Sequence, residues 1–199
     1  DWSQYRGPNQ DGIAAEQAAV NWPASGPKVL WKVPTPLGFS CFTVADGKAF
    51  TQVVRDVGGA PREVCLALDA ATGKELWAAE MGPGTFDKGG DSGTPENKGG
   101  NGPRSTPAVS GGKVYVFTQD LVLLCFDANT GKQVWTKDLT KEHAGRNIKP
   151  WRNAASPVID GNLIFLAGGG PGQSLLGIDK ATGKTVWKAH DEIITHASP

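Results

Sequence analysis

The ten residues Leu68-Asp69-Ala70-Ala71-Thr72-Gly73-Lys74-Glu75-Leu76-Trp77 recur twice more along the chain, and this recurrence decides the fold. The second copy runs from Phe126 to Trp135 and the third from Ile178 to Trp187. Five of the ten positions, which hold Asp, Thr, Gly, Lys and Trp, are identical in all three copies. A partial copy surrounds Trp31, so successive tryptophans are 46, 58 and 52 residues apart. A unit that repeats at this period indicates an architecture built from repeated supersecondary units.

The link Asp-x-x-Thr-Gly-Lys inside the repeat has the chemistry of a tight turn. The Asp carboxylate can accept a hydrogen bond from the backbone N–H two residues later, and the glycine can adopt the left-handed conformation that closes the turn. The residue two before each Asp is small (Ala67, Cys125 or Gly177), which predicts that the bulky indole lies against it. We assign structural roles to these residues of the repeat: Asp69, Gly73, Trp77, Asp127, Gly131, Trp135, Asp179, Gly183 and Trp187.

Upstream of each copy lies a short apolar run that ends in an Asp-Gly or Gly-Gly pair. Such pairs supply the positive φ angles that a two-residue β-hairpin turn requires. Each repeat therefore predicts four antiparallel strands, and four-stranded units at this period are the blades of a β-propeller. In the second repeat the strands are expected over residues 105–109, 113–119, 121–127 and 133–139. Equivalent blades are expected over residues 40–80 and 155–189, and a further blade begins at 195–199.

The composition agrees with an all-β fold of short strands and many turns, because 27 of the 199 residues are Gly and 14 are Pro. Twenty Lys+Arg balance twenty Asp+Glu, and a formal net charge of zero argues against nucleic acids and anionic membranes as partners. No window approaches the roughly 18 apolar residues of a transmembrane helix. The three cysteines lack Cys-x-x-Cys spacing, and Cys41 and Cys65 fall on predicted strands too far apart for a bridge, so free thiols are expected.

The pattern Ala67-x-Asp69-x-x-x-Gly73-x-x-x-Trp77 resembles the tryptophan-docking repeat of the pyrroloquinoline-quinone (PQQ)-like β-propeller superfamily. This superfamily includes quinoprotein alcohol dehydrogenases and the outer-membrane assembly factor B lipoproteins. The opening Asp1-Trp2-Ser3-Gln4-Tyr5-Arg6-Gly7-Pro8-Asn9 is similar to the mature N-terminus of exported members. The resemblance implies a propeller of seven or eight blades in an extracytoplasmic protein, periplasmic or secreted, from which a signal peptide has been removed.

At this spacing fewer than four repeats fit into 199 residues, whereas propellers close with about four to eight blades. We therefore expect a fragment: an open arc of three full blades and partial ones, whose neighbours are the remaining blades of a longer parent chain. Residues 1–34 are expected to form an N-terminal segment with an outer closing strand at Val29–Val33. Residues 35–199 are expected to form the PQQ-like propeller region.

Strand direction separates two faces of the arc. The turns between first and second strands and between third and fourth strands share one face, which we call the turn face. The opposite face, the long-loop face, is expected to carry the long connections, and long loops on a rigid scaffold are a frequent place for function. These connections are residues 55–62, 81–104, 139–154 and 168–174.

Three residues are candidates for a ligand site on the long-loop face. Arg104 and the pair Trp151-Arg152 each precede an innermost strand, where the blades meet the axis. A guanidinium and an indole at this position could hold an anionic or planar ligand. The alternative is a surface arginine that stacks on a tryptophan used for packing.

The sequence contains no recognisable catalytic motif, and we assign no catalytic, cofactor-binding or metal-binding residue. The acidic residues of the loop 81–104 do not match a calcium-binding loop. The leading hypothesis is a non-catalytic scaffold that binds a protein, peptide or envelope component on its long-loop face. The alternative is a fragment of a PQQ- and calcium-dependent alcohol dehydrogenase. Such enzymes commonly stack an adjacent Cys-Cys pair on the quinone, and this chain has no adjacent cysteines.

Overall fold

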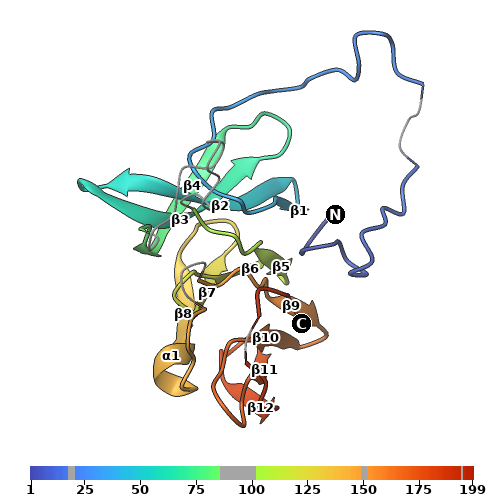
Figure 1. The fold of residues 1–199 in the computed structure, drawn as a ribbon. Coiled ribbons are helices and arrows are strands. Elements are labelled where there is room, and N and C mark those ends of the chain that lie inside the picture. The colour runs from blue at the N-terminus through green and yellow to red at the C-terminus, as the bar shows by residue number, and fades with distance from the viewer. Residues whose placement is uncertain (18–20, 86–101, 149–151, 194) are drawn as a thin grey trace, which may run out of the picture.

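The computed structural model describes all residues except 18–20, 86–101, 149–151 and 194. The described residues form three four-stranded antiparallel sheets and one short helix (Figure 1). The first sheet comprises β1 (Thr43–Ala45), β2 (Lys48–Val57), β3 (Ala60–Asp69) and β4 (Glu75–Pro83). The second comprises β5 (Ala108–Ser110), β6 (Lys113–Phe117), β7 (Val122–Asp127) and β8 (Gln133–Asp138). The third comprises β9 (Val158–Asp160), β10 (Leu163–Ala167), β11 (Leu175–Asp179) and β12 (Thr185–Ala189).

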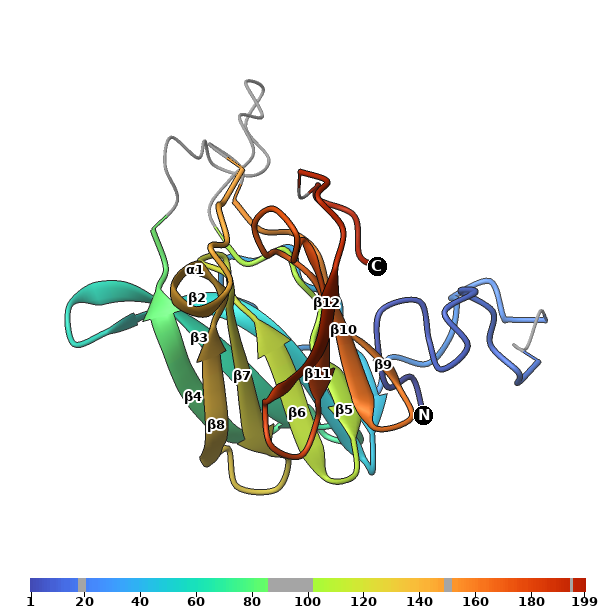
Figure 2. The same cartoon turned by 90° about the horizontal axis from the view of Figure 1, so that it is seen from below.

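Each sheet follows chain order from its inner to its outer strand, which confirms the predicted β-propeller blades. Figure 1 shows the inner strands β1, β5 and β9 in succession beside the N-terminus, with the outer strands β4, β8 and β12 farther away. The three sheets form an open arc, as expected. Figure 2 shows the short hairpin turns of the second and third sheets at one end of the arc and α1 (Leu139–Glu142) at the opposite end.

The core lies between consecutive sheets. The middle blade is covered on both sides, so the central residues of β7, Leu123 to Phe126, are all buried. The outer strand β12 of the last blade is covered on one face only, so its exposed residues alternate with partly buried ones. The interface of the first two blades buries Phe50, Cys65, Ala67, Val114, Val116 and Phe126. The interface of the last two buries Tyr115, Phe117, Leu123, Ile164, Leu166 and Ile178.

The turn between the third and fourth strands of each blade has the predicted chemistry. In the second blade, the Asp127 carboxylate accepts hydrogen bonds from the backbone N–H groups of Asn129 and Thr130, both at 3.1 Å. Hydrogen bonds donated to this carboxylate by the Lys113 ammonium, the Thr130 hydroxyl and the Asn129 N–H lower the pKa of Asp127 to about 2. Gly131 closes the turn with φ 69°, in the left-handed region that glycine tolerates best.

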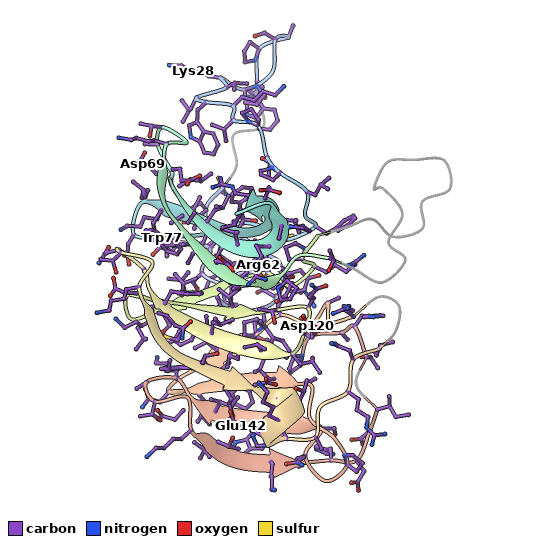
Figure 3. The ribbon with its side chains drawn as sticks, turned by 90° about the vertical axis from the view of Figure 1, so that its left-hand side faces the viewer. Lys28, Arg62, Asp69, Trp77, Asp120 and Glu142 are labelled. Atoms are coloured by element: carbon purple, nitrogen blue, oxygen red, sulfur yellow. The ribbon has the colours of Figure 1, made fainter. Side chains whose placement is uncertain are left out.

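The tryptophan of each repeat joins one blade to the next. Trp77 lies between the first and second sheets (Figure 3), and its indole Nε1 donates to the Ala128 carbonyl at 3.0 Å. The indole of Trp77 covers Gly131, the turn glycine of the second blade. Trp135 repeats this arrangement on the third blade, where it covers Gly183. These contacts couple the blades through equivalent residues.

Gly131→Ala is expected to destabilise the protein more than Gly111→Ala. Both glycines have positive φ, 69° and 57°, so an alanine costs about 1–2 kcal/mol of backbone strain at either position. Only at Gly131 does an added Cβ lie 2.8 Å from the Trp77 ring, which adds about 1–3 kcal/mol of overpacking. Chemical unfolding of both variants measures the difference, and equal losses would show that the indole contact does not matter.

The predicted long loop at residues 55–62 is wrong. β2 and β3 continue pairing to the Val57–Ala60 pair, so the connection is only Gly58-Gly59. Both glycines have positive φ, 64° and 83°, which is the geometry of a two-residue hairpin turn. The Asp56 carboxylate accepts a hydrogen bond from the Gly59 N–H at 3.0 Å and supports this turn.

Residues Val29–Val33, expected as an outer strand that completes the last blade of a closed ring, form no strand here, and no described strand pairs with them. Their role in a complete ring stays a prediction. An extended segment without a ladder partner is left solvated, and Val29 and Leu30 are 74% and 72% exposed. The tryptophan in this segment is nevertheless placed like those of the full repeats. Trp31 Nε1 donates to the Ala70 carbonyl at 3.0 Å, and the ring covers Gly73.

The outer strand of the second blade ends one residue earlier than predicted, because a helical turn begins there. Asp138 caps α1, and its carboxylate accepts hydrogen bonds from the backbone N–H groups of Thr140 and Lys141.

A membrane-spanning helix, which must be long and apolar, is not found among the described residues.

All three cysteines are free, as predicted, although Cys41 lies before β1 rather than on it. Burial raises the pKa of Cys65 far above its usual value and that of Cys125 to about 12, whereas Cys41 is exposed. A thiol reagent at pH 8 is therefore expected to modify one cysteine rapidly in the native protein and all three after unfolding. Rapid modification of two or three thiols in the native protein would contradict this packing.

Candidate functional site

The segments that lead into the inner strands are tied together by a chain of equivalent hydrogen bonds. The backbone N–H of Cys41 donates to the Thr106 hydroxyl at 3.3 Å, and the Thr106 N–H donates to the Ser156 hydroxyl at 2.9 Å. The Ser156 N–H continues the series to the Ser198 hydroxyl, also at 2.9 Å. Hydroxyls of the second and third blades, and of Ser198 beyond them, therefore fix the spacing at the long-loop end of the inner strands.

The N-terminal residues 1–7, which we call the N-terminal strap, cross the inner edges of the blades (Figure 2). Trp2 exchanges two backbone hydrogen bonds with Val44 of β1, with N···O distances of 2.7 and 2.9 Å. Ser3 accepts a hydrogen bond from the N–H of Val109 in β5 at 2.7 Å. Consecutive strap residues thus bond to equivalent positions of consecutive blades.

Gln4 makes the corresponding contact to the third blade with its side chain. Its Oε1 accepts from the Ile159 N–H at 2.8 Å, and its Nε2 donates to the Ile159 carbonyl at 3.4 Å. The side chain is buried, with Gln4 only 6% exposed. These two bonds hold the strap at the third blade and set where the following residues point.

A pocket of about 540 Å³, the axial pocket, opens where the strap meets the starts of the inner strands. This volume lies within the range of ligand-binding sites. The pocket is built from the segments that lead into the inner strands of all three blades, from the strap and residues just after it, and from the C-terminal residues 196–199. Its lining includes Tyr5, Arg6, Phe39, Arg104, Thr106 and Ser156.

Arg104, a predicted ligand residue, does line this pocket. Its guanidinium lies 5.1 Å from the centroid of the Phe39 ring, and its NH1 donates to the Gly102 carbonyl at 3.3 Å. Partial burial lowers the pKa of Arg104 below its usual value, and the charge of Glu63 opposes that shift. The ring beside this arginine is a phenylalanine, whereas the alternative in the sequence analysis was stacking on a tryptophan, which stays untested.

Arg152 lies elsewhere and is engaged differently. Its guanidinium forms an ion pair with Asp120, and Arg152 has positive φ, 57°. Figure 3 shows Asp120 at the end of the sheets opposite Asp69, which places this ion pair on the long-loop face. Trp151 lies outside the described residues. Of the two candidates that the structure describes, Arg104 lines the pocket and Arg152 does not.

A buried carboxyl group lies close enough to Arg104 and Arg152 to feel their charges. Glu63 of β3 is 1% exposed, and its Oε2 accepts a hydrogen bond from the Gln119 N–H at 3.3 Å. Within the described part of the chain, its Oε1 has no hydrogen-bond partner. Burial raises the pKa of Glu63 to about 8, and the nearby charges of Asp120, Arg152 and Arg104 modify this value.

Two components of the site were missed by the sequence analysis. The hydroxyl chain had a signal, since Ser or Thr precedes Pro at Thr106-Pro107, Ser156-Pro157 and Ser198-Pro199. The contribution of Arg6 had no signal in the sequence, because the strap reaches the pocket through contacts with strands more than 40 residues away along the chain.

A calcium-bound quinone, which the fold family implies, does not fit the pocket lining as described. Calcium prefers six to eight oxygen ligands that include carboxylates. The described lining offers hydroxyls, aromatic rings, two guanidinium groups, the Cys41 thiol, the Gln10 amide and the His196 imidazole, but no Asp or Glu side chain. The described ranges, taken together, also contain no group of three or more His, Cys, Asp or Glu arranged for a metal ion.

Comparison with known proteins places this geometry in a family. The family model described as outer membrane protein assembly factor BamB matches residues 61–198, more than half of the chain. Quinohemoprotein alcohol dehydrogenase ADH IIB of Pseudomonas putida is 30% identical over 127 residues, which is 62% of this chain and 17% of that protein. The chain therefore spans only a small part of this curated relative.

Solved structures show the same fold at lower identity. BamB from Moraxella catarrhalis superposes with a TM-score of 0.51 and 21% identity, over 78% of this chain and 37% of that chain. Quinohemoprotein alcohol dehydrogenase from Comamonas testosteroni gives a TM-score of 0.54 and 22% identity, over 77% of this chain and 21% of that chain. From its repeats, its blades and the matching family model, the chain belongs to the PQQ-like β-propeller family described as outer membrane protein assembly factor BamB.

Proposed function

We propose that this chain is part of a non-catalytic, extracytoplasmic scaffold that binds a protein partner on its long-loop face. The observation that carries the proposal is the axial pocket, which opens at the starts of the inner strands and is lined by two arginines and two exposed aromatic side chains. Arginine and aromatic residues are enriched where proteins bind partners. The match to an outer membrane assembly factor supports an envelope location and a protein partner.

Site-specific photo-crosslinking tests this proposal. A photoreactive amino acid at Gln10, which lines the pocket, is expected to cross-link the chain to a discrete envelope protein of the source organism. The matched control places the same group at Asn129, an exposed residue in a turn of the turn face. Cross-links from Asn129 alone, or equally from both positions, would contradict a partner on the long-loop face.

The second candidate is a fragment of a quinoprotein alcohol dehydrogenase, favoured by the 30% identity to a quinohemoprotein enzyme. The two candidates differ in whether the chain retains quinone. The protein is incubated with PQQ and calcium chloride, with an EDTA-treated sample as the control, and then passed through a gel-filtration column. The scaffold proposal expects no quinone absorbance in the protein peak. Calcium-dependent retention near one quinone per chain would support the dehydrogenase instead.

A further inference from the structure

We propose that the N-terminal strap is a movable wall of the axial pocket, held closed by the side chain of Gln4 and hinged where Trp2 pairs with β1. In the closed state, which the structure shows, Tyr5 and Arg6 of the strap line the pocket. In the open state, the strap has left the third blade while it remains attached to the first. The inference concerns regulation of the proposed site, and it rests on the proposed function only for its effect on the partner.

The strap is held unequally at its two ends. At the first blade, Trp2 exchanges two backbone hydrogen bonds with Val44, at 2.7 and 2.9 Å. In the part of the chain that the structure describes, both hydrogen bonds from the strap to the third blade are made by the Gln4 side chain. One of these, from Nε2 to the Ile159 carbonyl, is long at 3.4 Å and therefore weak. The strap should thus detach from the third blade more easily than from the first.

Glutamine suits this attachment because its amide resembles a peptide group. It presents one acceptor and one donor group, so Gln4 pairs with both the N–H and the carbonyl of Ile159. Ile159 is the middle residue of β9, as Val44 is of β1, so the strap occupies equivalent positions on these inner strands. When the strap opens, water can replace Gln4 at Ile159, and no backbone group there stays buried without a partner.

The residues around Gln4 add little to hold the strap closed. Among residues 1–17, only Gln4 and Gly7 are buried, and Gly7 is covered by a ring of the strap itself. Arg6 and Gln10 have positive φ, 63° and 60°, a conformation that is strained for residues other than glycine. An exposed segment with few contacts and a strained backbone has low local stability. These features favour local opening of the strap without unfolding of the blades.

The opposite wall of the pocket does not depend on the strap. The C-terminal residues 196–199 form this wall, and the Ser198 hydroxyl accepts a hydrogen bond from the Ser156 N–H at 2.9 Å. The same series of hydroxyl contacts, through Thr106 to Cys41, joins the segments that lead into the inner strands. None of these hydrogen bonds involves the strap, so opening moves one wall and leaves the rest of the pocket in place.

Closure of the strap and binding of the partner are linked. A partner that contacts Tyr5 or Arg6 in the pocket makes those contacts only in the closed state, and it therefore shifts the strap toward closure. By the same linkage, a variant that opens the strap weakens binding of the partner.

The first test is amide hydrogen exchange of the full chain, followed by NMR. Gln4→Ala is expected to speed exchange of the Ile159 amide by about tenfold or more, because that N–H loses its acceptor. The Val44 amide should change less, since its bond to the Trp2 backbone remains. The Leu124 amide, in the buried middle of β7, reports global unfolding and should not change.

The matched control is Gln17→Ala, which removes an exposed glutamine of the same N-terminal segment and should leave all these rates unchanged. Unchanged exchange at Ile159 in folded Gln4→Ala would overturn the proposal. Equal acceleration at Ile159 and Leu124 would overturn it as well, because the strap would then open only when the whole chain unfolds.

A second measurement follows the pocket from inside. The exposed Cys41 lines it, so Gln4→Ala is expected to speed modification of this thiol by a reagent at fixed pH. Gln4→Glu should act in the same direction, since it keeps the side-chain size but loses the donor to Ile159 and buries a charge. Cys65 and Cys125 are buried and should stay slow. Wild-type rates at Cys41 in both variants would overturn the proposal.

Photo-crosslinking from Gln10 in the Gln4→Ala background connects the strap to the partner. The yield of the cross-link to the envelope protein is expected to fall relative to the chain that retains Gln4. An unchanged yield would overturn the link between closure and binding. If Gln10 does not cross-link even when Gln4 is present, the proposed function is contradicted, whereas the exchange and thiol rates still decide whether the strap opens.

Discussion

Trp135→Ala is expected to lower the free energy of unfolding by about 3–5 kcal/mol, the range for truncating a large aromatic side chain in a core. Trp135 packs against Tyr115 of its own blade, with ring centroids 5.9 Å apart. It also covers Gly183 of the third blade, and its Nε1 donates to the Lys180 carbonyl at 3.3 Å. The variant loses contacts within one blade and between two blades, which chemical unfolding measures as a lower midpoint.

The matched control is Trp187→Ala, at the same position of the third repeat. Trp187 packs against Phe165 and Gly177 of its own blade, but no further described blade lies beyond it. We therefore expect a smaller loss, about 1–2 kcal/mol, since only contacts within the blade are removed. Equal losses in the two variants would mean that the contact between blades adds little to stability.

Glu63→Gln is expected to change the pH dependence of stability. Burial raises the pKa of Glu63 from 4.5 to about 8, so the folded protein holds a proton that the unfolded chain releases above about pH 4.5. The wild-type protein therefore loses stability as pH rises from about 4.5 to 8, by up to about 5 kcal/mol from this group. The amide that replaces the carboxyl group stays neutral at every pH, so the variant should not show this loss.

The measurement is chemical unfolding of both proteins between pH 4.5 and pH 9. Subtracting the two curves removes the contribution of the three histidines, which titrate in both proteins. The variant should gain stability relative to the wild-type protein across this range, and above pH 8 it should be the more stable of the two. A difference that stays constant with pH would show that Glu63 is ionised in the folded state at all these pH values.

The blades could be predicted because their determinants are local. The Asp-x-x-Thr-Gly-Lys turns, the Gly-Gly and Asp-Gly hairpins and the small residues opposite the tryptophans each act within about ten residues. The paired positions Ala67–Trp77, Cys125–Trp135 and Gly177–Trp187 confirm that reasoning. The error at residues 55–62 arose because strand pairing decides there: β2 and β3 extend their hairpin to the Val57–Ala60 pair.

The site could be predicted only in part. Arg104 was found because its position before an inner strand places it near the axis, which is a consequence of topology. Arg6 and Glu63 gave no such signal. The position of Arg6 depends on a strap that bonds to residues as distant as Ile159, and the burial of Glu63 depends on packing of the first blade against the second. Neither interaction leaves a periodic pattern in the sequence.

The most direct test of the account is photo-crosslinking from Gln10, which lines the axial pocket, compared with Asn129 on the turn face. The account predicts cross-links to a discrete envelope protein from Gln10 and none from Asn129. Cross-links from Asn129 alone, or equally from both positions, would contradict a partner on the long-loop face.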